Sequence, residues 1–143
     1  MKLELKHIKH YLDHDILYSI DGETGILKPY HLGMHLKTIE RGQNFKLHLR
    51  PMSDLVKKIE VDGKKFVPII ELAKIKWESK NWRLSSSGLY VVENGIMTFE
   101  YTNNTFFIND IACTYQLNLF EKLFEWHFDV FGLIDQGLAL PLI

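Results

Sequence analysis

Cysteine is nearly absent from this sequence, since Cys113 is the only one among 143 residues. An intramolecular disulfide is therefore excluded, and with it the small secreted folds that depend on disulfides. No stretch of 18 uncharged apolar residues exists, and the N-terminal MKLELKHIKH alternates charge with Leu and Ile. Neither a membrane-spanning helix nor a signal peptide is predicted, and we expect a protein of a reducing cytoplasm.

Motifs of the common enzyme classes are also missing. The serine run at 85–88 lacks the glycine that precedes the serine of a nucleophile elbow, and no glycine-rich phosphate loop is present. Cys113 lies in the apolar run Ile-Ala-Cys, which raises the pKa of a thiol, so it is a poor nucleophile for His127 to activate. We expect a non-enzymatic protein without a cofactor.

The composition is that of an ordered globular protein, with 46% hydrophobic and 24% charged residues. A chain of this length folds without a disulfide or metal, and we expect one domain over residues 1–143. The net charge of −1 hides a division, because residues 1–83 hold 16 of the 17 Lys and Arg against 11 acids. Residues 84–143 hold Lys122 alone against 7 acids. The basic half would steer a polyanion if it stands apart, or attract the acidic half if the two pack together.

The most unusual segment is residues 117–134, with the sequence LNLFEKLFEWHFDVFGLI. As one helix it would confine its polar residues to an arc of roughly 100°, with apolar side chains over most of the remaining surface. Such a helix needs cover from two or three sides. It is predicted to be the central core helix, and a docking element completed by a partner is the alternative.

Strands are predicted where β-branched and aromatic residues lie between turn sequences. They form a hairpin around DGETG at 16–20 and 26–30, a strand at 45–49, and a three-stranded meander at 89–93, 96–101 and 105–109. Short helices are predicted at 2–12, 53–60 and 69–75. Together these elements predict an α+β fold, in which an antiparallel sheet of hairpin and meander packs on the long C-terminal helix.

Cations and tryptophans alternate in residues 74–83, KIKWESKNWR. Cations neutralise phosphates and indoles stack on exposed bases, as single-strand binding requires. Alternatively, the tryptophans are core anchors with lysine stems packed alongside. With the lysines upstream, the predicted site for a nucleic acid or partner protein comprises Lys57, Lys58, Lys64, Lys65, Lys74, Lys76, Trp77, Lys80, Trp82 and Arg83.

Histidines offer a further alternative, a metalloprotein. Two pairs have the i, i+4 spacing that zinc ligands use on a helix. No HExxH or paired-cysteine pattern accompanies them, so solvent-facing histidines are the simpler interpretation and no metal is assigned. The residues concerned are His7, His10, His14, His31 and His35, with Asp13, Asp15 or His48 as a third ligand.

Three stretches together resemble a known group of proteins: KLELKHI at 2–8, LRPMSDLVKKIEVDGKKFVPIIEL at 49–72 and FEKLFEWHFDVFGLIDQGLAL at 120–140. They are similar to small uncharacterised proteins of phages and prophages of Bacteroidetes-type bacteria, which share an RPLSDL-like helix start and a WHFDVFGLI-like closing segment. Matching positions cover about a third of the chain, and residues 74–110 match nothing in that group. The resemblance implies a viral origin and action in the cytoplasm of a bacterial host.

Small accessory proteins of such origin often bind and block a host component, including defence complexes such as CRISPR effectors. By this analogy we expect a non-enzymatic phage protein that binds a host or phage protein or ribonucleoprotein. A single-stranded RNA-binding protein is the first alternative, and a histidine-based metalloprotein is the second.

Overall fold

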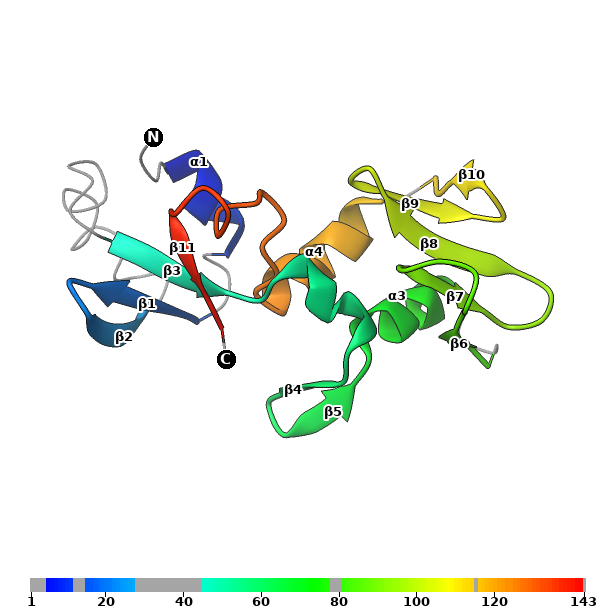
Figure 1. Cartoon of the computed structure of the whole chain (residues 1–143), viewed down its shortest axis with the longest axis horizontal. Coiled ribbons are helices and arrows are strands. Elements are labelled where there is room, and N and C mark those ends of the chain that lie inside the picture. Colours follow the sequence, from blue (N-terminus) through cyan, green and yellow to red (C-terminus); the bar gives the residue numbers. More distant parts are fainter. Residues whose placement is uncertain (1–4, 12–14, 28–44, 78–80, 115, 143) are drawn as a thin grey trace. The chain divides into compact units, whose positions relative to one another are not determined.

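The computed structural model of the chain describes residues 5–11, 15–27, 45–77, 81–114 and 116–142. The chain divides into two compact units (Figure 1). Unit 1 consists of Met1–Met52 with Leu123–Ile143, and unit 2 of Ser53–Lys122, so unit 2 is inserted in sequence between the two parts of unit 1. Two compact units can form one domain or two, and the expectation of one domain stays a prediction.

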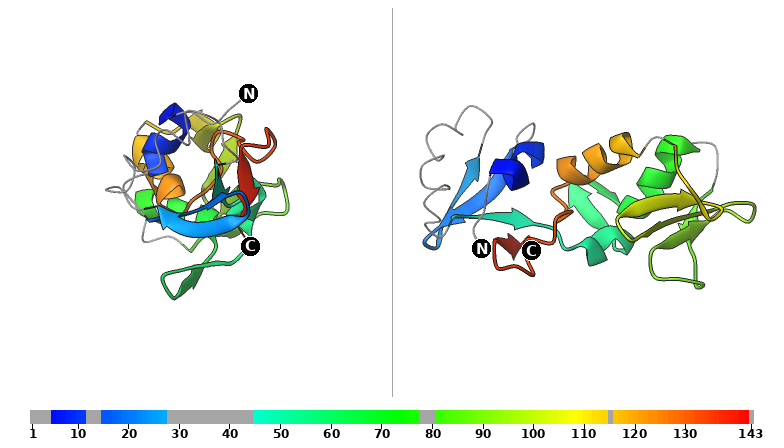
Figure 2. Two further views of the ribbon diagram at one scale, coloured as in Figure 1. Left: turned by 90° about the vertical axis from the view of Figure 1, so that its left-hand side faces the viewer. Right: turned by 90° about the horizontal axis from the view of Figure 1, so that it is seen from above.

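Unit 1 contains a four-stranded sheet in the order β11-β3-β1-β2. β1 (Ile16–Ile20) and β2 (Glu23–Leu27) form an antiparallel hairpin, and β3 (Phe45–Leu49) pairs antiparallel with β1 on its other side. β11 (Ala139–Pro141) pairs parallel with β3. Figures 1 and 2 show the blue hairpin, the cyan β3 and the red β11. This sheet therefore joins the two sequence segments that make up unit 1.

The strands predicted at 16–20 and 45–49 are confirmed as β1 and β3. The second hairpin strand begins earlier than the predicted 26–30, because a two-residue turn at Asp21 and Gly22 replaces the longer DGETG loop. Both turn residues have positive φ, 51° and 87°, as in the tight turns that connect antiparallel strands. Residues 28–30 of the predicted strand lie outside the described residues.

The helix predicted at 2–12 is only partly correct within the described residues, and residues 2–4 and 12 lie outside them. α1 (Leu5–Ile8) continues as the 3₁₀ turn η1 (Lys9–Tyr11), whereas the sequence predicted a helix at 2–12. Ile8 and Tyr11 are fully buried. The Tyr11 hydroxyl donates a hydrogen bond to the carbonyl of Phe128, so this element is fixed to a segment more than 100 residues away. Burial raises the pKa of the Tyr11 phenol well above its usual range.

The long C-terminal helix predicted at 117–134 is wrong, because α4 covers only Leu117–Glu125. His127 has φ 63°, a left-handed conformation that cannot continue an α-helix. Its carbonyl accepts the N–H of Arg50 at 2.7 Å, and the N–H of Asp129 bonds to the Arg50 carbonyl at 2.8 Å. Phe128 thereby forms a parallel bridge with Arg50. Backbone pairing with a distant segment ends the helix where the apolar pattern would extend it.

Asp129 fixes the chain after this bridge. The side chain is 6% exposed although it is acidic. Its two oxygens accept the N–H groups of Leu133 at 2.7 Å and Ile134 at 2.9 Å. Such bonds to a carboxylate are about twice as strong as those between neutral groups. The Arg50 side chain adds a bond from Nε to the carbonyl of Trp126 at 3.0 Å. The second half of the aromatic run is therefore a hydrogen-bonded turn structure.

Unit 2 contains an antiparallel sheet in the order β10-β9-β8-β7-β6. Its strands are β6 (Arg83–Leu84), β7 (Val91–Glu93), β8 (Thr98–Thr102), β9 (Thr105–Ile108) and β10 (Ile111–Ala112). The predicted meander is confirmed as β7, β8 and β9, paired consecutively. The sequence did not predict the two short outer strands.

Four further elements of unit 2 precede this sheet in sequence, and the first part of α4 follows it. η3 (Met52–Val56) is a 3₁₀ helix that begins at the boundary of unit 1, and β4 (Ile59–Val61) pairs with β5 (Lys64–Phe66) in a separate hairpin. The helix predicted at 53–60 is thus only partly correct, since cross-strand pairing takes over after Val56. α3 (Pro68–Lys76) confirms the helix predicted at 69–75 and has Pro68 in its first turn.

The predicted fold class is also wrong. Within the described residues the regular secondary structure is mostly strand, with three sheets and 11 strands, and the longest helices have 9 residues. The predicted hairpin and meander do not share a sheet, since they belong to different units. Alternation of apolar residues indicates that a segment is a strand, but it does not indicate which strand becomes its partner.

The Asp129 carboxylate predicts a measurable contribution to stability. We expect Asp129→Ala to lower the free energy of unfolding by about 2–4 kcal/mol, because a buried donor left without an acceptor is unfavourable by about 1–3 kcal/mol. Urea denaturation followed by circular dichroism measures this change. Asp135→Ala removes an exposed carboxylate nearby and serves as control, with an expected effect below about 0.5 kcal/mol. Equal stabilities of the two variants would contradict the role given to Asp129.

The raised pKa of Tyr11 predicts a loss of stability at alkaline pH. An unfolded tyrosine ionises near pH 10 whereas the buried phenol stays protonated, so unfolding releases a proton above that pH. The stability from Tyr11 is complete below pH 10 and falls as pH rises towards the folded pKa. We expect the wild type to lose more unfolding free energy between pH 9 and 11 than Tyr11→Phe. Parallel loss in both proteins, measured by urea denaturation, would contradict this prediction.

Candidate macromolecule-binding surface

Exposed lysines in unit 2 form the main part of the predicted site. Nine of the ten predicted residues are described, and Lys80 lies outside the described residues. Five exposed lysines precede β4, lie on β5 or lie on α3, and we call them the lysine cluster: Lys57, Lys58, Lys64, Lys65 and Lys74. Their elements are successive in the chain, and Figure 1 shows the β4–β5 hairpin next to α3 in green.

Carboxylates partly neutralise this cluster. Glu71 on α3 lies 3.7 Å from the ammonium group of Lys64 and 3.7 Å from that of Lys74, and Lys57 lies 3.4 Å from Asp54. Lys65 stands opposite Glu60 in the hairpin register. Such exposed pairs contribute about 0–1 kcal/mol each, so the lysines remain able to exchange these partners for others.

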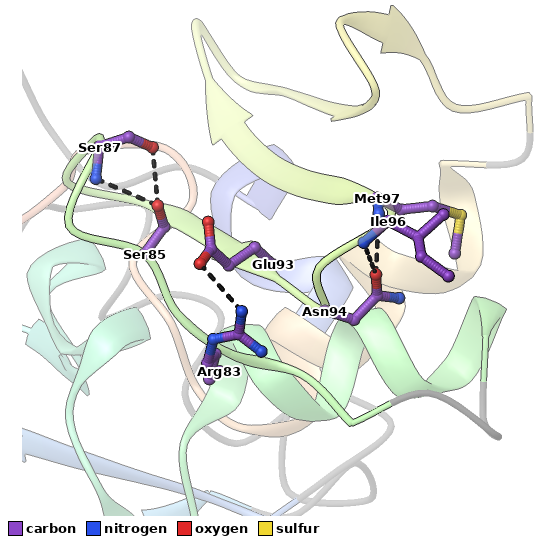
Figure 3. A network of polar contacts seen from close by, with 7 residues as sticks. All are labelled: Arg83, Ser85, Ser87, Glu93, Asn94, Ile96 and Met97. Atoms are coloured by element: carbon purple, nitrogen blue, oxygen red, sulfur yellow. Dashed lines mark hydrogen bonds and ion pairs between the residues drawn. The ribbon is translucent and has the colours of Figure 1, made fainter.

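The division of charge along the sequence does not separate the two units. It falls between Arg83 and Leu84, which both belong to β6 of unit 2. Unit 2 therefore contains residues 53–83 of the basic segment and residues 84–122 of the acidic segment. Arg83 forms an ion pair of 3.3 Å with Glu93 on the neighbouring strand (Figure 3). Figure 3 also shows hydroxyls of the serine run bonded to each other, between Ser85 and Ser87.

The two tryptophans of the predicted site lie in an aromatic cluster of unit 2. Trp77 and Trp82 have ring centroids 6.2 Å apart and lie 6.2 and 6.4 Å from Phe99, which stacks on Phe106. Trp82 is 7% exposed, and its indole N–H donates to the carbonyl of Trp77 at 3.2 Å. Of the two interpretations of these tryptophans, the core anchor fits Trp82. Trp77 is half-buried.

A pocket of about 420 Å³ lies between the end of α3 and the β9–β10 hairpin. Ile111 at its rim is 70% exposed. The sequence predicted Lys76 and Trp77 as site residues but missed the others. Ile108 and Asn109 were predicted only as the end of the meander, and residues 111–114 follow it in a segment given no structure. The alternation of Ile108, Ile111 and Cys113 around an Asn-Asp turn is the signal that could have found them. The pocket is lined by Lys76, Trp77, Ile108, Asn109, Ile111, Ala112, Cys113 and Thr114.

Cys113 contributes a buried thiol to this pocket. The residue is 8% exposed. Burial raises its pKa, and the positive charge of Lys76 opposes that shift to a smaller extent. The prediction that an apolar environment raises the pKa of this thiol is confirmed. At neutral pH the group is therefore a protonated thiol, which is a poor nucleophile.

Two described histidines of unit 1, His7 and His10, contact aromatic rings. His10 stacks on Phe124 with centroids 4.8 Å apart, and His7 lies edge-on to Phe131 at 6.2 Å. His48 lies on β3 between two buried leucines, and Asp15 is exposed. In the described ranges no three His, Cys, Asp or Glu residues are grouped as metal ligands would be. The other predicted ligands lie outside these ranges: Asp13, His14, His31 and His35.

Comparison with protein-family models, curated proteins and solved structures finds no significant match to this chain. No helix in the described part of the chain has the length and apolar character needed to cross a lipid bilayer. The functional interpretation therefore depends on the lysine cluster, the aromatic cluster and the pocket of unit 2.

The state of Cys113 predicts slow alkylation. We expect iodoacetamide at pH 7.5 to modify Cys113 at least tenfold more slowly than it modifies free cysteine, because burial limits both access and the thiolate fraction. Mass spectrometry measures the rate without ambiguity, since the chain has one cysteine. The urea-unfolded protein is the control and should react like free cysteine. A native rate equal to the unfolded rate would contradict the buried, protonated thiol.

Proposed function

We propose that the protein is a non-enzymatic accessory protein of a phage or prophage, which acts in the host cytoplasm by binding an acidic surface of another protein. The observation that carries this proposal is the lysine cluster, five exposed ammonium groups on successive elements of one compact unit. Lysine side chains at a surface attract acidic partners over several ångströms and speed association.

One of the segments that resemble phage proteins includes most of the lysine cluster. The block at 49–72 contains four of the five lysines and spans η3, the β4–β5 hairpin and the first part of α3. The segment that carries the likeness is thus also the segment that carries the cluster. A host defence complex such as a CRISPR effector is the partner class that this origin favours, by analogy with other small phage proteins.

Single-stranded RNA is the second candidate, because ammonium groups pair with phosphates as well as with carboxylates. Sequence-tolerant binding of single strands also uses exposed aromatic rings on which bases stack. Trp82 is buried and bonded to Trp77, so it does not provide such a ring. The lysine cluster is therefore not supplemented by stacking on Trp82, which favours an acidic protein.

The test is recovery of partners from bacterial lysate on the tagged full-length chain. Lysates of infected and uninfected Bacteroidetes-type hosts are used, each with and without nuclease. We expect a nuclease-resistant protein partner whose recovery falls at least tenfold for the double variant Lys58→Glu with Lys65→Glu, and falls with added salt. These two exposed lysines were chosen because the other three form the ion pairs within unit 2 described above.

The matched control is Lys6→Glu with Lys9→Glu, which makes the same charge change at exposed positions of unit 1 and should retain the partner. Loss of the partner on nuclease treatment would show that the protein binds RNA rather than an acidic protein. Equal recovery by the lysine variant, or no partner above background from any lysate, would contradict the lysine cluster as a binding surface.

A further inference from the structure

The edge of the unit 2 sheet at β10 has backbone groups directed away from the sheet. The N–H of Cys113 donates to the carbonyl of Phe106 at 3.0 Å, and Ala112 stands opposite Phe107 in the β10–β9 register. Directly opposed residues of antiparallel strands alternate between hydrogen-bonded and non-hydrogen-bonded pairs. Ala112 and Phe107 therefore form a non-hydrogen-bonded pair. The N–H and C=O of Ala112 point outward, where a further strand would pair.

The side chains of this edge do not protect it. Natural edge strands are protected from pairing with another chain by lysine, proline, a bulge or a very short length. β10 and β6 are equally short, with 2 residues each, so the two edges differ in their side chains. β10 consists of Ile111 and Ala112, both exposed, and neither is charged or a proline. The opposite edge differs, because β6 carries Arg83 in an ion pair with Glu93. Of the two edges of this sheet, β10 is the one suited to strand addition.

The pocket lies on one face of this edge. Ile108 and Ile111 stand opposite each other, and Cys113 follows two residues later, so these side chains share one face of the sheet. All three line the pocket together with Trp77. A strand added beside Ala112 would direct alternate side chains to the same face. One of them would meet the pocket, whose lining is mainly apolar.

The charge of Lys76 indicates which charge a strand bound beside the pocket would carry. Among the eight residues that line the pocket, all of them described, it is the one with a charged side chain. Lys76 and Cys113 line the same pocket, and the positive charge of Lys76 opposes the rise that burial causes in the pKa of Cys113. An acidic side chain close to the apolar one would complement this charge.

We propose that the β10 edge binds an extended peptide segment of a partner protein by strand addition. Main-chain bonds form at Ala112, an apolar side chain enters the pocket, and an acidic side chain two residues away lies near Lys76. In this mode the backbone supplies affinity and the pocket supplies specificity. The inference rests on the proposed function in taking the partner to be a protein, and it assigns a second contact outside the lysine cluster.

Fluorescein-labelled synthetic peptides of the design Thr-Ile-Thr-Glu-Thr test this site on the full-length protein by fluorescence anisotropy. Further members of the set carry Val, Leu or Phe in place of Ile. We expect saturable binding, at least tenfold weaker when Lys replaces Glu or when the threonine amides are N-methylated. Absence of saturable binding by every peptide up to about 1 mM would overturn the proposal.

Ala112→Pro removes the outward N–H and should weaken peptide binding at least tenfold. Leu84→Pro is the matched control. The N–H of Ser85 donates to the carbonyl of Val91, so Leu84 has an outward N–H at the same register position of the opposite edge. Leu84→Pro should leave the affinity for the peptides unchanged. Loss with Leu84→Pro alone would place the peptide at the other edge and overturn the proposal.

Hydrogen exchange on the unsubstituted protein gives a readout that does not depend on variants folding. Peptide binding should slow exchange of the Ala112 amide, and saturable binding without this protection would overturn the proposal. The charge-reversed lysine variant should bind the peptides normally. The two proposals therefore fail separately, the lysine cluster through the pulldown and the β10 edge through the peptides.

Discussion

Backbone pairing between Arg50 and the segment around Phe128 is the interaction on which unit 1 depends. Arg50 directly follows β3, and its N–H, its carbonyl and its side chain bond to three residues of the later segment, His127, Asp129 and Trp126 respectively. The Tyr11 hydroxyl reaches the carbonyl of Phe128 from a third part of the chain. Because these bonds position the chain that leads to β11, the parallel pairing of β11 with β3 depends on them as well.

The sequence contains enough local information for several elements, but not for how they combine. β1, β3, the meander and α3 were predictable because turn residues, alternation and a proline at the first helical turn are all signals within a few residues. The helix at 117–134 was predicted from the same kind of signal and failed. What ends it is a positive φ at His127 and pairing with Arg50, far away in sequence. Helical periodicity indicates which face of a helix would be apolar, but it does not indicate where tertiary pairing ends the helix.

The candidate surfaces show the same limit. Exposure of the lysines follows from their charge, and the sequence therefore indicated them. The role of the tryptophans was left open between stacking and core packing, and only the position of Trp82 beside Phe99 distinguishes the two. The pocket at Ile111 needed a tertiary contact, because the end of α3 meets a hairpin that begins more than 25 residues later. The feature best suited to recognise a peptide was the least visible in the sequence.

The insertion of unit 2 between the two parts of unit 1 has a consequence for synthesis on the ribosome. β3 emerges before unit 2 and β11 emerges after it. One edge of β3 therefore has no parallel partner until all of Ser53–Lys122 has been made. Unit 2 is continuous in sequence, so all of it leaves the ribosome before β11 does. Contacts between distant segments form slowly. During that interval the unpaired edge of β3 is open to pairing with another chain.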